Sequence, residues 1–344
     1  MRKIQNIQAL RGVAVLVVVL FHMMLVEKKY GGAVSILPGF LEFGNFGVDL
    51  FFVISGFVMV TVTRGRFQNL KQSLLFLYRR ASRIYPLYWV YTLAALAVFL
   101  VQPGWVNSSQ GNRADILASF LLLPSDLLPL VQVGWTLVHE MYFYIGFFLI
   151  FMLIPERMLS AAVLLWGIVV VVFDFLGLSP TPAYRLVFHP LTVEFLGGCL
   201  LAVLYHRDKP LRLGGMWLTA AATLALLAAI LGHIAHGTIP GGWQRVLIYG
   251  LPALLIVFLI TEAERNGTLL PAALIQSGDA SYSIYLSHLF TINVVGRLWA
   301  VFAVDQVYDN FILLPVMFAA TVFIGFLSYR LIETPLLRLS RRVA

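Results

Sequence analysis

Arg11 and His22 have side chains that can take part in chemistry, yet both lie inside an otherwise apolar segment, IQALRGVAVLVVVLFHMM, residues 7–24. In a helix, eleven residues make three turns plus about 20°, so both side chains share one face, about 16 Å apart along the axis. An arginine at the centre of a membrane helix costs roughly 2.5–3.5 kcal/mol, which makes such residues functional candidates. An imidazole suits a general base, and a permanent cation suits anion binding. The alternative is that Arg11 snorkels to the inner surface and His22 hydrogen-bonds a neighbouring helix.

Two acidic residues in apolar segments are candidate partners for His22. Asp49 lies in NFGVDLFFVISGFVM, residues 45–59, and Glu140 lies in GWTLVHEMYFY, residues 134–144. Glu140 and His22 reach comparable depths when they are counted from opposite ends of their helices, so they could meet. We expect a carboxylate, Glu140 or Asp49, to orient the His22 ring, although Asp49 could instead face interfacial water.

A second group of residues favours an elongated ligand that carries phosphates. Arg80 and Arg83, in YRRASRIYPLYW (78–89), are i,i+3 neighbours and can direct both guanidinium groups at one anion. Anchoring of the chain at the inner face of the membrane is the alternative. Ser55 and Gly56 are small enough for a thin ligand to pass closely, and close helix packing explains them equally well.

Trp135, Tyr142 and His288 are candidates for binding a neutral, hydroxyl-rich ligand. Trp135 and Tyr142 lie on the same segment as Glu140, towards the side predicted to be outside. His288 shares a helix face with Ser281 and Tyr285, and a hydrogen-bonded packing role is its alternative. With arginines gathered at the other side, a polyanion would arrive from the cytoplasm and a polyhydroxyl compound from outside.

The elements that position these residues must be membrane-spanning α-helices. The chain has 344 residues, of which 60% are hydrophobic and 12% charged, and its mean hydropathy is +0.88; soluble domains carry about 25% charged residues. No alternation typical of a barrel is visible, so helices must satisfy the backbone in lipid. Cys199 is the single cysteine, which excludes an internal disulfide or a thiolate metal cluster, and no metal is expected. The net charge is +8, and the basic residues that produce it line one face of the membrane. This arrangement favours lipid phosphate or a phosphorylated ligand over nucleic acid as the partner.

The fold class is therefore all-α, with about ten spans in one domain, residues 1–344. Residues 116–131 contain Pro124 and Pro129 and are predicted to be re-entrant or to lie at the surface. Of the 24 Lys and Arg residues, 17 fall in segments predicted to be inside and six outside, so both termini are expected in the cytoplasm. The predicted spans are 7–26, 45–63, 84–102, 133–154, 159–178, 190–205, 215–234, 245–261, 281–301 and 309–330.

These motifs resemble the membrane acyltransferase-3 superfamily, which O-acylates bacterial surface sugars such as O-antigen and exopolysaccharide. FGVDLFFVISGFVM is most similar to the exopolysaccharide-modifying branch. The resemblance implies an acyl-coenzyme A donor, usually acetyl-CoA, a sugar or lipid-linked glycan acceptor, and a multi-pass protein of the bacterial inner membrane. The matching elements, in chain order, are Arg11 with His22, Phe52-x-x-Ser55-Gly56, Arg80-x-x-Arg83, WTLVHEMYFY and SYSIYLSH.

The resemblance also implies roles for individual residues. Arg80 and Arg83 bind the donor, Arg11 positions its thioester or pantetheine arm, which threads past Ser55 and Gly56, and His22 is the essential histidine. Our hypothesis is direct transfer, in which His22 takes the proton of a sugar hydroxyl as that hydroxyl attacks the thioester. An acyl-histidine relay stays open. The rival functions are a transporter or flippase of a lipid-linked sugar, against which the absence of an inverted sequence repeat argues, and a non-catalytic scaffold.

Overall fold

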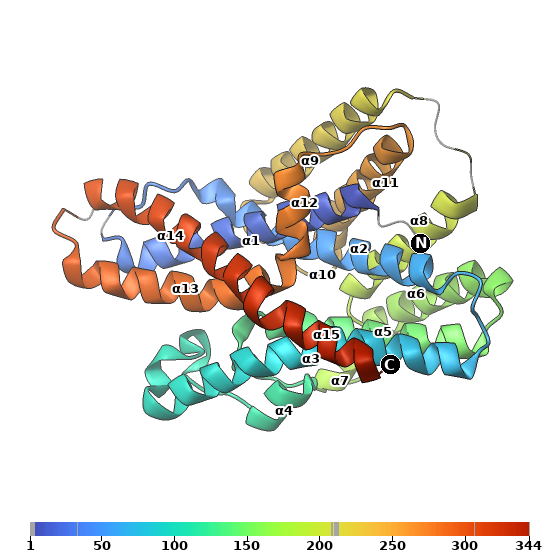
Figure 1. Ribbon diagram of the computed structural model, residues 1–344, viewed down its shortest axis with the longest axis horizontal. Coiled ribbons are helices and arrows are strands. Elements are labelled where there is room, and N and C mark those ends of the chain that lie inside the picture. Colours follow the sequence, from blue (N-terminus) through green and yellow to red (C-terminus); the bar gives the residue numbers. More distant parts are fainter. Residues whose placement is uncertain (1–3, 33, 208, 210–212, 306, 344) are drawn as a thin grey trace. The chain divides into compact units, whose positions relative to one another are not determined.

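The computed structural model describes residues 4–343 except 33, 208, 210–212 and 306, and the described residues form helices and no strands (Figure 1). The all-helical prediction is confirmed. Three of the predicted inside charges, Arg2, Lys3 and Arg212, lie outside the described residues. In chain order the α-helices are α1 (Gln5–Tyr30), α2 (Phe46–Thr63), α3 (Leu70–Val101), α4 (Ile116–Leu121), α5 (Trp135–Leu153), α6 (Leu159–Leu176), α7 (Pro182–Val187), α8 (Leu191–Arg207), α9 (Gly215–His236), α10 (Gly242–Arg245), α11 (Leu251–Arg265), α12 (Ala272–Asp279), α13 (Ser281–Phe302), α14 (Tyr308–Ser328) and α15 (Thr334–Val343).

Ten helical segments in the described part of the chain are long and apolar enough to span a membrane, as the sequence predicts. Some of them join consecutive helices of the chain, such as α7 with α8 and α14 with α15. They are Gln5–Tyr30, Gly39–Thr63, Leu70–Val101, Gln132–Leu153, Glu156–Leu176, Pro182–His206, Gly215–His236, Gly242–Arg265, Ser281–Phe302 and Tyr308–Ser340.

The third span begins earlier than predicted. Helix α3 starts at Leu70, where the Asn69 side chain accepts a hydrogen bond from the backbone N–H of Gln72, whereas the predicted span started at residue 84. The predicted span covered only the apolar stretch from residue 84, but helix formation does not require an apolar sequence outside the hydrocarbon layer. Arg80 and Arg83 therefore lie within the helix, on consecutive turns.

The segment 116–131 forms no span. Only the short helix α4 occurs there, and it ends at Leu122, whose φ of 53° is left-handed. Residues 123–131 form irregular chain that leads to the 3-10 helix η4 (Gln132–Gly134) and the start of α5. This agrees with the expectation that the two prolines keep the segment from crossing the membrane.

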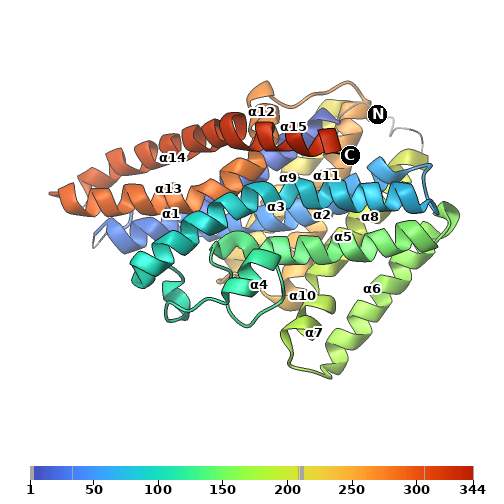
Figure 2. The ribbon, with the colours of Figure 1, turned by 60° about the horizontal axis from the view of Figure 1, so that its bottom comes forward.

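The chain divides into two compact units, each assembled from two stretches of sequence. Unit 1 comprises residues 1–54 and 207–331, and unit 2 comprises 55–206 and 332–344. In unit 1, α1 packs against α12, α13 and the 3-10 helix η1 (Gly39–Asn45), and α13 lies beside α14 (Figure 1). In unit 2, α3 lies beside both α5 and α15 (Figure 2).

The crossing of α1 and α12 in unit 1 depends on two glycines. A Cβ at Gly278 would lie 1.7 Å from the carbonyl oxygen of Gln8, and a Cβ at Gly12 would lie 2.2 Å from that of Leu274. Both obstacles are backbone atoms, so a larger residue would have to push the helices apart. Small residues at such crossings let membrane helices approach closely. The crossing thereby sets the position of α1, the helix that carries His22.

Replacing Gly278 with alanine is expected to destabilise the protein by about 1–3 kcal/mol, because the added methyl group overlaps the backbone of α1. Thermal unfolding in detergent, followed by fluorescence-detected size exclusion, measures the effect. Gly167→Ala is the matched control, since a Cβ there would meet only the flexible Cδ1 of Leu196, at 3.6 Å. Equal melting temperatures for the two variants would contradict the role of the crossing.

Candidate active site

His22 lies half-buried on α1 and contacts a second histidine within unit 1. The His22 Nδ1 atom is 2.9 Å from the carbonyl oxygen of Val18 and 3.3 Å from Nε2 of His288. His288 is fully buried on α13, and its Nδ1 lies 2.6 Å from the carbonyl oxygen of Tyr285. The two imidazole rings meet edge to face, with centroids 4.9 Å apart.

These contacts define where the protons lie on both rings. A carbonyl oxygen only accepts hydrogen bonds, so His288 carries its proton on Nδ1 and, when neutral, presents Nε2 as an acceptor. The Nδ1–H of His22 then donates to the Val18 carbonyl and to His288 Nε2. In a neutral His22 ring this leaves the lone pair on Nε2, the atom that can take a proton from an alcohol.

The surroundings of the two histidines are mainly aromatic. Phe21 packs edge-on against His22, with ring centroids 4.8 Å apart, and Tyr285 lies 5.8 Å from His288. Phe51, from the first half of α2, packs edge-on against Tyr285. Arg11 is half-buried on the same uninterrupted helix and donates to the Gln8 side chain. Its spacing from His22 keeps the guanidinium out of reach of that ring.

Asp49 is fully buried in unit 1 and forms an ion pair with Arg245 of α10. Arg245 Nε donates to Oδ1 of Asp49 at 2.8 Å, and its Nη2 donates to Oδ2 at 2.7 Å. Arg245 Nη2 also donates to the carbonyl oxygen of Asn45, and its guanidinium lies over the Tyr249 ring. Both carboxylate oxygens are thus engaged by one guanidinium. Sequence reasoning missed this pair because nothing local connects residues so far apart in the chain.

In unit 2, Glu140 joins a polar cluster formed by α2, α3 and α5. Its Oε1 atom accepts hydrogen bonds from the Ser55 hydroxyl, at 3.3 Å, and from the Tyr144 hydroxyl. The structure therefore brings together two predicted site residues, Ser55 and Glu140. Tyr144 was not predicted, although its i+4 spacing from Glu140 places it one helical turn away on the same face.

Arg80 faces this cluster from α3. The charges of Glu140 and Arg83 act on Arg80, and its guanidinium hydrogen-bonds the Tyr144 hydroxyl. Within the described chain, Arg80 Nε is buried and has no hydrogen-bond partner. A buried donor without an acceptor is costly, so an unpaired guanidinium N–H beside a polar cluster is a natural contact for an anionic or carbonyl-bearing ligand.

Two further predicted residues already have contacts in unit 2. A Cβ at Gly56 would lie 1.9 Å from the Phe195 carbonyl oxygen, so the close approach there is made by α8. The Tyr142 hydroxyl donates to the carbonyl oxygen of Val187 and accepts from the Trp166 indole, which ties α5 to α7 and α6. Ligand-binding roles for Gly56 and Tyr142 stay predictions.

The predicted residues divide between the two units. The expected meeting of His22 with Glu140 concerns residues of different units and stays a prediction. No cluster of three or more His, Cys, Asp or Glu side chains able to hold a metal ion occurs among the described residues. Unit 1 holds Arg11, His22, Asp49 and His288, and unit 2 holds Ser55, Gly56, Arg80, Arg83, Trp135, Glu140 and Tyr142.

Comparison with known proteins gives a consistent set of similarities. Residues 4–330 match the family model described as an acyltransferase domain. The chain is 32% identical to the exopolysaccharide production protein ExoZ of Rhizobium meliloti over 87% of this chain and 91% of that protein. It is 25% identical to the acyltransferase MdmB of Streptomyces mycarofaciens, over 87% and 82% of the two chains. It is 26% identical to the peptidoglycan O-acetyltransferase OatA of Listeria monocytogenes, over 97% of this chain and 56% of that protein. No solved structure matches the chain.

Proposed function

Since the chain belongs to the acyltransferase-3 family of membrane acyltransferases, we propose that it moves an acetyl group from acetyl-coenzyme A to a hydroxyl of a cell-surface or lipid-linked sugar. Two similarities support the acceptor class, because one relative is named for exopolysaccharide production and another for O-acetylation of peptidoglycan. The ten apolar helices support a multi-pass location, which we propose to be the bacterial inner membrane.

The observation that carries this proposal is the proton arrangement at His22. With Nδ1–H held by Val18 and His288, the Nε2 lone pair accepts the proton of the sugar hydroxyl. The sugar oxygen attacks the thioester carbonyl, and the tetrahedral intermediate expels the coenzyme A thiolate. That thiolate then takes the proton from the His22 imidazolium, which yields free coenzyme A and the sugar ester and returns His22 to its neutral form. A positioned base of this kind contributes about 10²–10⁴-fold to the rate.

We assign the orientation of the His22 ring to His288 rather than to a carboxylate. His288 is buried, and its own Nδ1–H is fixed by the Tyr285 carbonyl, so its Nε2 is a fixed acceptor for His22. Asp49, a candidate on sequence grounds, is engaged by Arg245 through both oxygens, which supports a structural role. Glu140 has its own partners in unit 2, where it holds Ser55 and Tyr144 beside Arg80.

Binding of the donor is proposed for Arg80 and Arg83, with Arg11 as a further cation for the acyl-bearing arm. Coenzyme A carries phosphates and a chain of amide carbonyls, all of which accept hydrogen bonds from guanidinium groups. The buried Nε of Arg80 supports this role, because a bound acceptor would satisfy it.

Arg80→Ala is expected to raise the KM for acetyl-coenzyme A by about 10- to 100-fold, since hydrogen bonds to charged groups are worth about 1.5–3 kcal/mol. Initial rates at varied donor concentration measure the change. Arg79→Ala is the matched control, because Arg79 is the neighbouring residue of α3 but is exposed. A rise of similar size in both variants would indicate a general charge effect and contradict a specific contact by Arg80.

Turnover by purified protein in proteoliposomes tests the proposed function. Vesicles that receive acetyl-coenzyme A and an oligosaccharide on opposite sides should release free thiol and form sugar ester in equal amounts. Movement of a lipid-linked sugar without loss of thioester would instead indicate a transporter. Unchanged acetyl content of the surface glycan after deletion of the protein would indicate a scaffold.

A further inference from the structure

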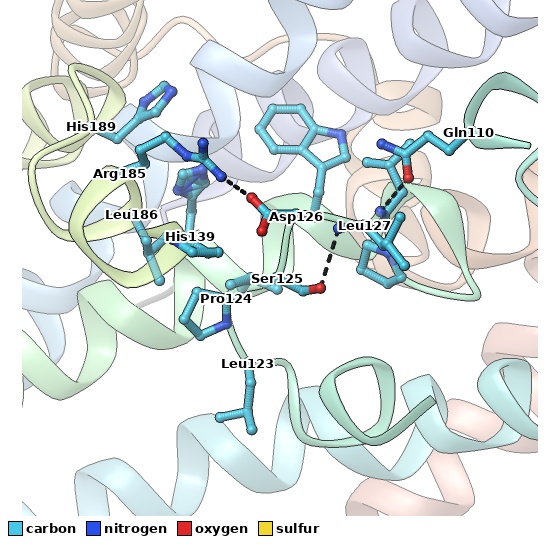
Figure 3. Close-up of a pocket in the computed structure, with 15 residues that line it drawn as sticks. Gln110, Leu123, Pro124, Ser125, Asp126, Leu127, His139, Arg185, Leu186 and His189 are labelled. Atoms are coloured by element: carbon cyan, nitrogen blue, oxygen red, sulfur yellow. Dashed lines mark hydrogen bonds and ion pairs between the residues drawn. The ribbon is translucent and has the colours of Figure 1, made fainter. Parts of the chain in front are cut away.

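Unit 2 contains a cavity of about 190 Å³, and most of the residues that line it are not among the predicted site residues (Figure 3). It opens where the first turns of α5, the helix α7 and the irregular chain around residues 123–129 meet. Trp135, a predicted substrate-binding residue, lines it. The other side chains used below are Gln110, Asp126, His139, Arg185 and His189.

One wall of the cavity is a row of three rings. Trp135 is half-buried, and its ring meets that of His139 edge to face, with centroids 5.7 Å apart. His139 in turn lies 4.9 Å from His189 between ring centroids. Trp135 and His139 stand one turn apart on α5, which places both on the same helix face. An aromatic face of this kind packs against the C–H face of a sugar ring, a contact that a hydrated phosphate does not make.

The polar lining contains both donors and acceptors and is balanced in charge. Arg185 and Asp126, which both line the cavity and are more than half exposed, form an ion pair (Figure 3). Gln110 Oε1 accepts from the backbone N–H of Leu128, which leaves the amide NH₂ as its donor group. His189 Nδ1 accepts from the Leu191 N–H, so a neutral His189 ring carries its proton on Nε2. Gln110 and His189 thus provide donors whose orientation is set by backbone contacts, and the more exposed Arg185–Asp126 pair adds a cation and an acceptor. A ligand with several hydroxyls requires such a mixture.

The size and location of the cavity favour the sugar acceptor over the coenzyme A donor as its occupant. Pockets for drug-sized ligands measure about 300–1,000 Å³, so a cavity of 190 Å³ suits one sugar ring and not a nucleotide-bearing coenzyme. The opposite ends of the helices of unit 2 carry Arg64, Arg66, Lys71 and Arg157. By the positive-inside rule that end is cytoplasmic, which places the cavity on the outer side, where a surface glycan is present.

We propose that this cavity binds one neutral pyranose ring of the acceptor glycan, an inference that rests on the proposed acyl transfer. The sugar ring stacks on Trp135, and its vicinal hydroxyls bridge the Arg185–Asp126 pair. Glu140 follows Trp135 by five residues on α5, about 7.5 Å along the axis. The cavity therefore lies one to two turns from the Glu140, Ser55 and Tyr144 cluster of the same unit.

Saturation-transfer NMR on the full chain in nanodiscs tests the proposal, with methyl glucoside, galactoside and mannoside and their trisaccharides as probes. Wild-type protein and His22→Ala should both give saturation transfer to the pyranose protons. Trp135→Ala and Asp126→Asn should abolish it. Asp126 is 71% exposed, so the Asn variant is expected to fold normally. Trp217→Ala, at a tryptophan 68% exposed on α9, is the matched control and should bind as the wild type does.

The same variants separate this inference from the proposed function. In the proteoliposome assay, Trp135→Ala and Asp126→Asn should raise the acceptor KM at least tenfold and leave the donor KM unchanged. Normal acceptor KM and normal sugar binding in both variants would overturn the sugar site while acyl transfer stands. Sugar binding that depends on Trp135, in a protein that consumes no thioester, would contradict acyl transfer and leave the sugar site. Preferential binding of hexuronates over neutral glycosides would overturn the neutral-sugar assignment.

Discussion

Replacement of His22 with alanine is expected to lower kcat for acyl transfer by about 10²–10⁴-fold, the range contributed by a positioned general base. The donor KM should change little, because the proposed donor contacts are made by arginines. The variant removes the Nε2 lone pair together with the Nδ1 contacts to Val18 and His288, and it leaves Gly12 and Gly278 of the α1 and α12 crossing in place. Steady-state rates of thiol release and ester formation measure the loss.

Two other histidine variants make this test specific. His236→Ala is the matched control, since His236 is half-buried at the end of α9, where its ring contacts the Thr238 carbonyl oxygen and the Gln244 side chain. His288→Leu should reduce kcat, whereas His288→Gln, which retains an acceptor for His22 Nδ1–H, should recover part of the rate. Full activity of His22→Ala would overturn the mechanism. Labelled acyl-protein that accumulates without acceptor, and is lost in His22→Ala, would favour an acyl-histidine relay over direct transfer.

Asp49→Ala is expected to destabilise the protein by about 3–5 kcal/mol, because it leaves the buried guanidinium of Arg245 without its carboxylate. Arg245→Ala should cost a similar amount. The double variant should be more stable than either single variant, since it leaves no unpaired charge. Thermal unfolding in detergent measures all three proteins, and Lys28→Ala, which removes a more exposed ion pair with Glu42, should cost at most about 1 kcal/mol.

The double variant also distinguishes a structural Asp49 from a catalytic one. If Asp49 serves only to hold Arg245, the Asp49→Ala, Arg245→Ala protein should regain activity in step with its stability. A double variant that is stable but inactive would contradict the structural assignment. It would restore Asp49 as a candidate for the proton-transfer machinery.

Much of the fold was predictable because lipid imposes a strict length and composition on spanning helices. All ten spans were found from apolar runs, including the sixth, which begins at Pro182 instead of residue 190. The start of α3 was not predictable from hydropathy. There the helix continues through Lys71 and Arg79 beyond the apolar stretch, and its N-terminus depends on the Asn69 cap.

The candidate site was predictable as a set of residues but not as a set of contacts. Unusual side chains in apolar segments identified His22, Asp49 and Glu140, because such residues are costly in lipid. The partners of these residues depend on tertiary packing. His288 lies 266 residues from His22 along the chain, and Arg245 lies 196 from Asp49, so no local periodicity links them. Tyr144 is different, because its i,i+4 spacing from Glu140 predicts from the sequence that the two side chains share a helix face.

The pairing of Asp49 with Arg245 has a consequence for biogenesis. At about 5–20 residues per second, a ribosome needs roughly 10–40 s to make the 196 residues between them. During that time the nascent α2 carries an unpaired carboxylate in its first turn, and an aspartate costs up to about 2.5–3.5 kcal/mol on insertion when it lies at a helix centre. The Asp49 carboxylate therefore gains its guanidinium partner only after α10 has been made. Truncated chains that stop before α10 should accordingly be preferred targets of membrane proteases.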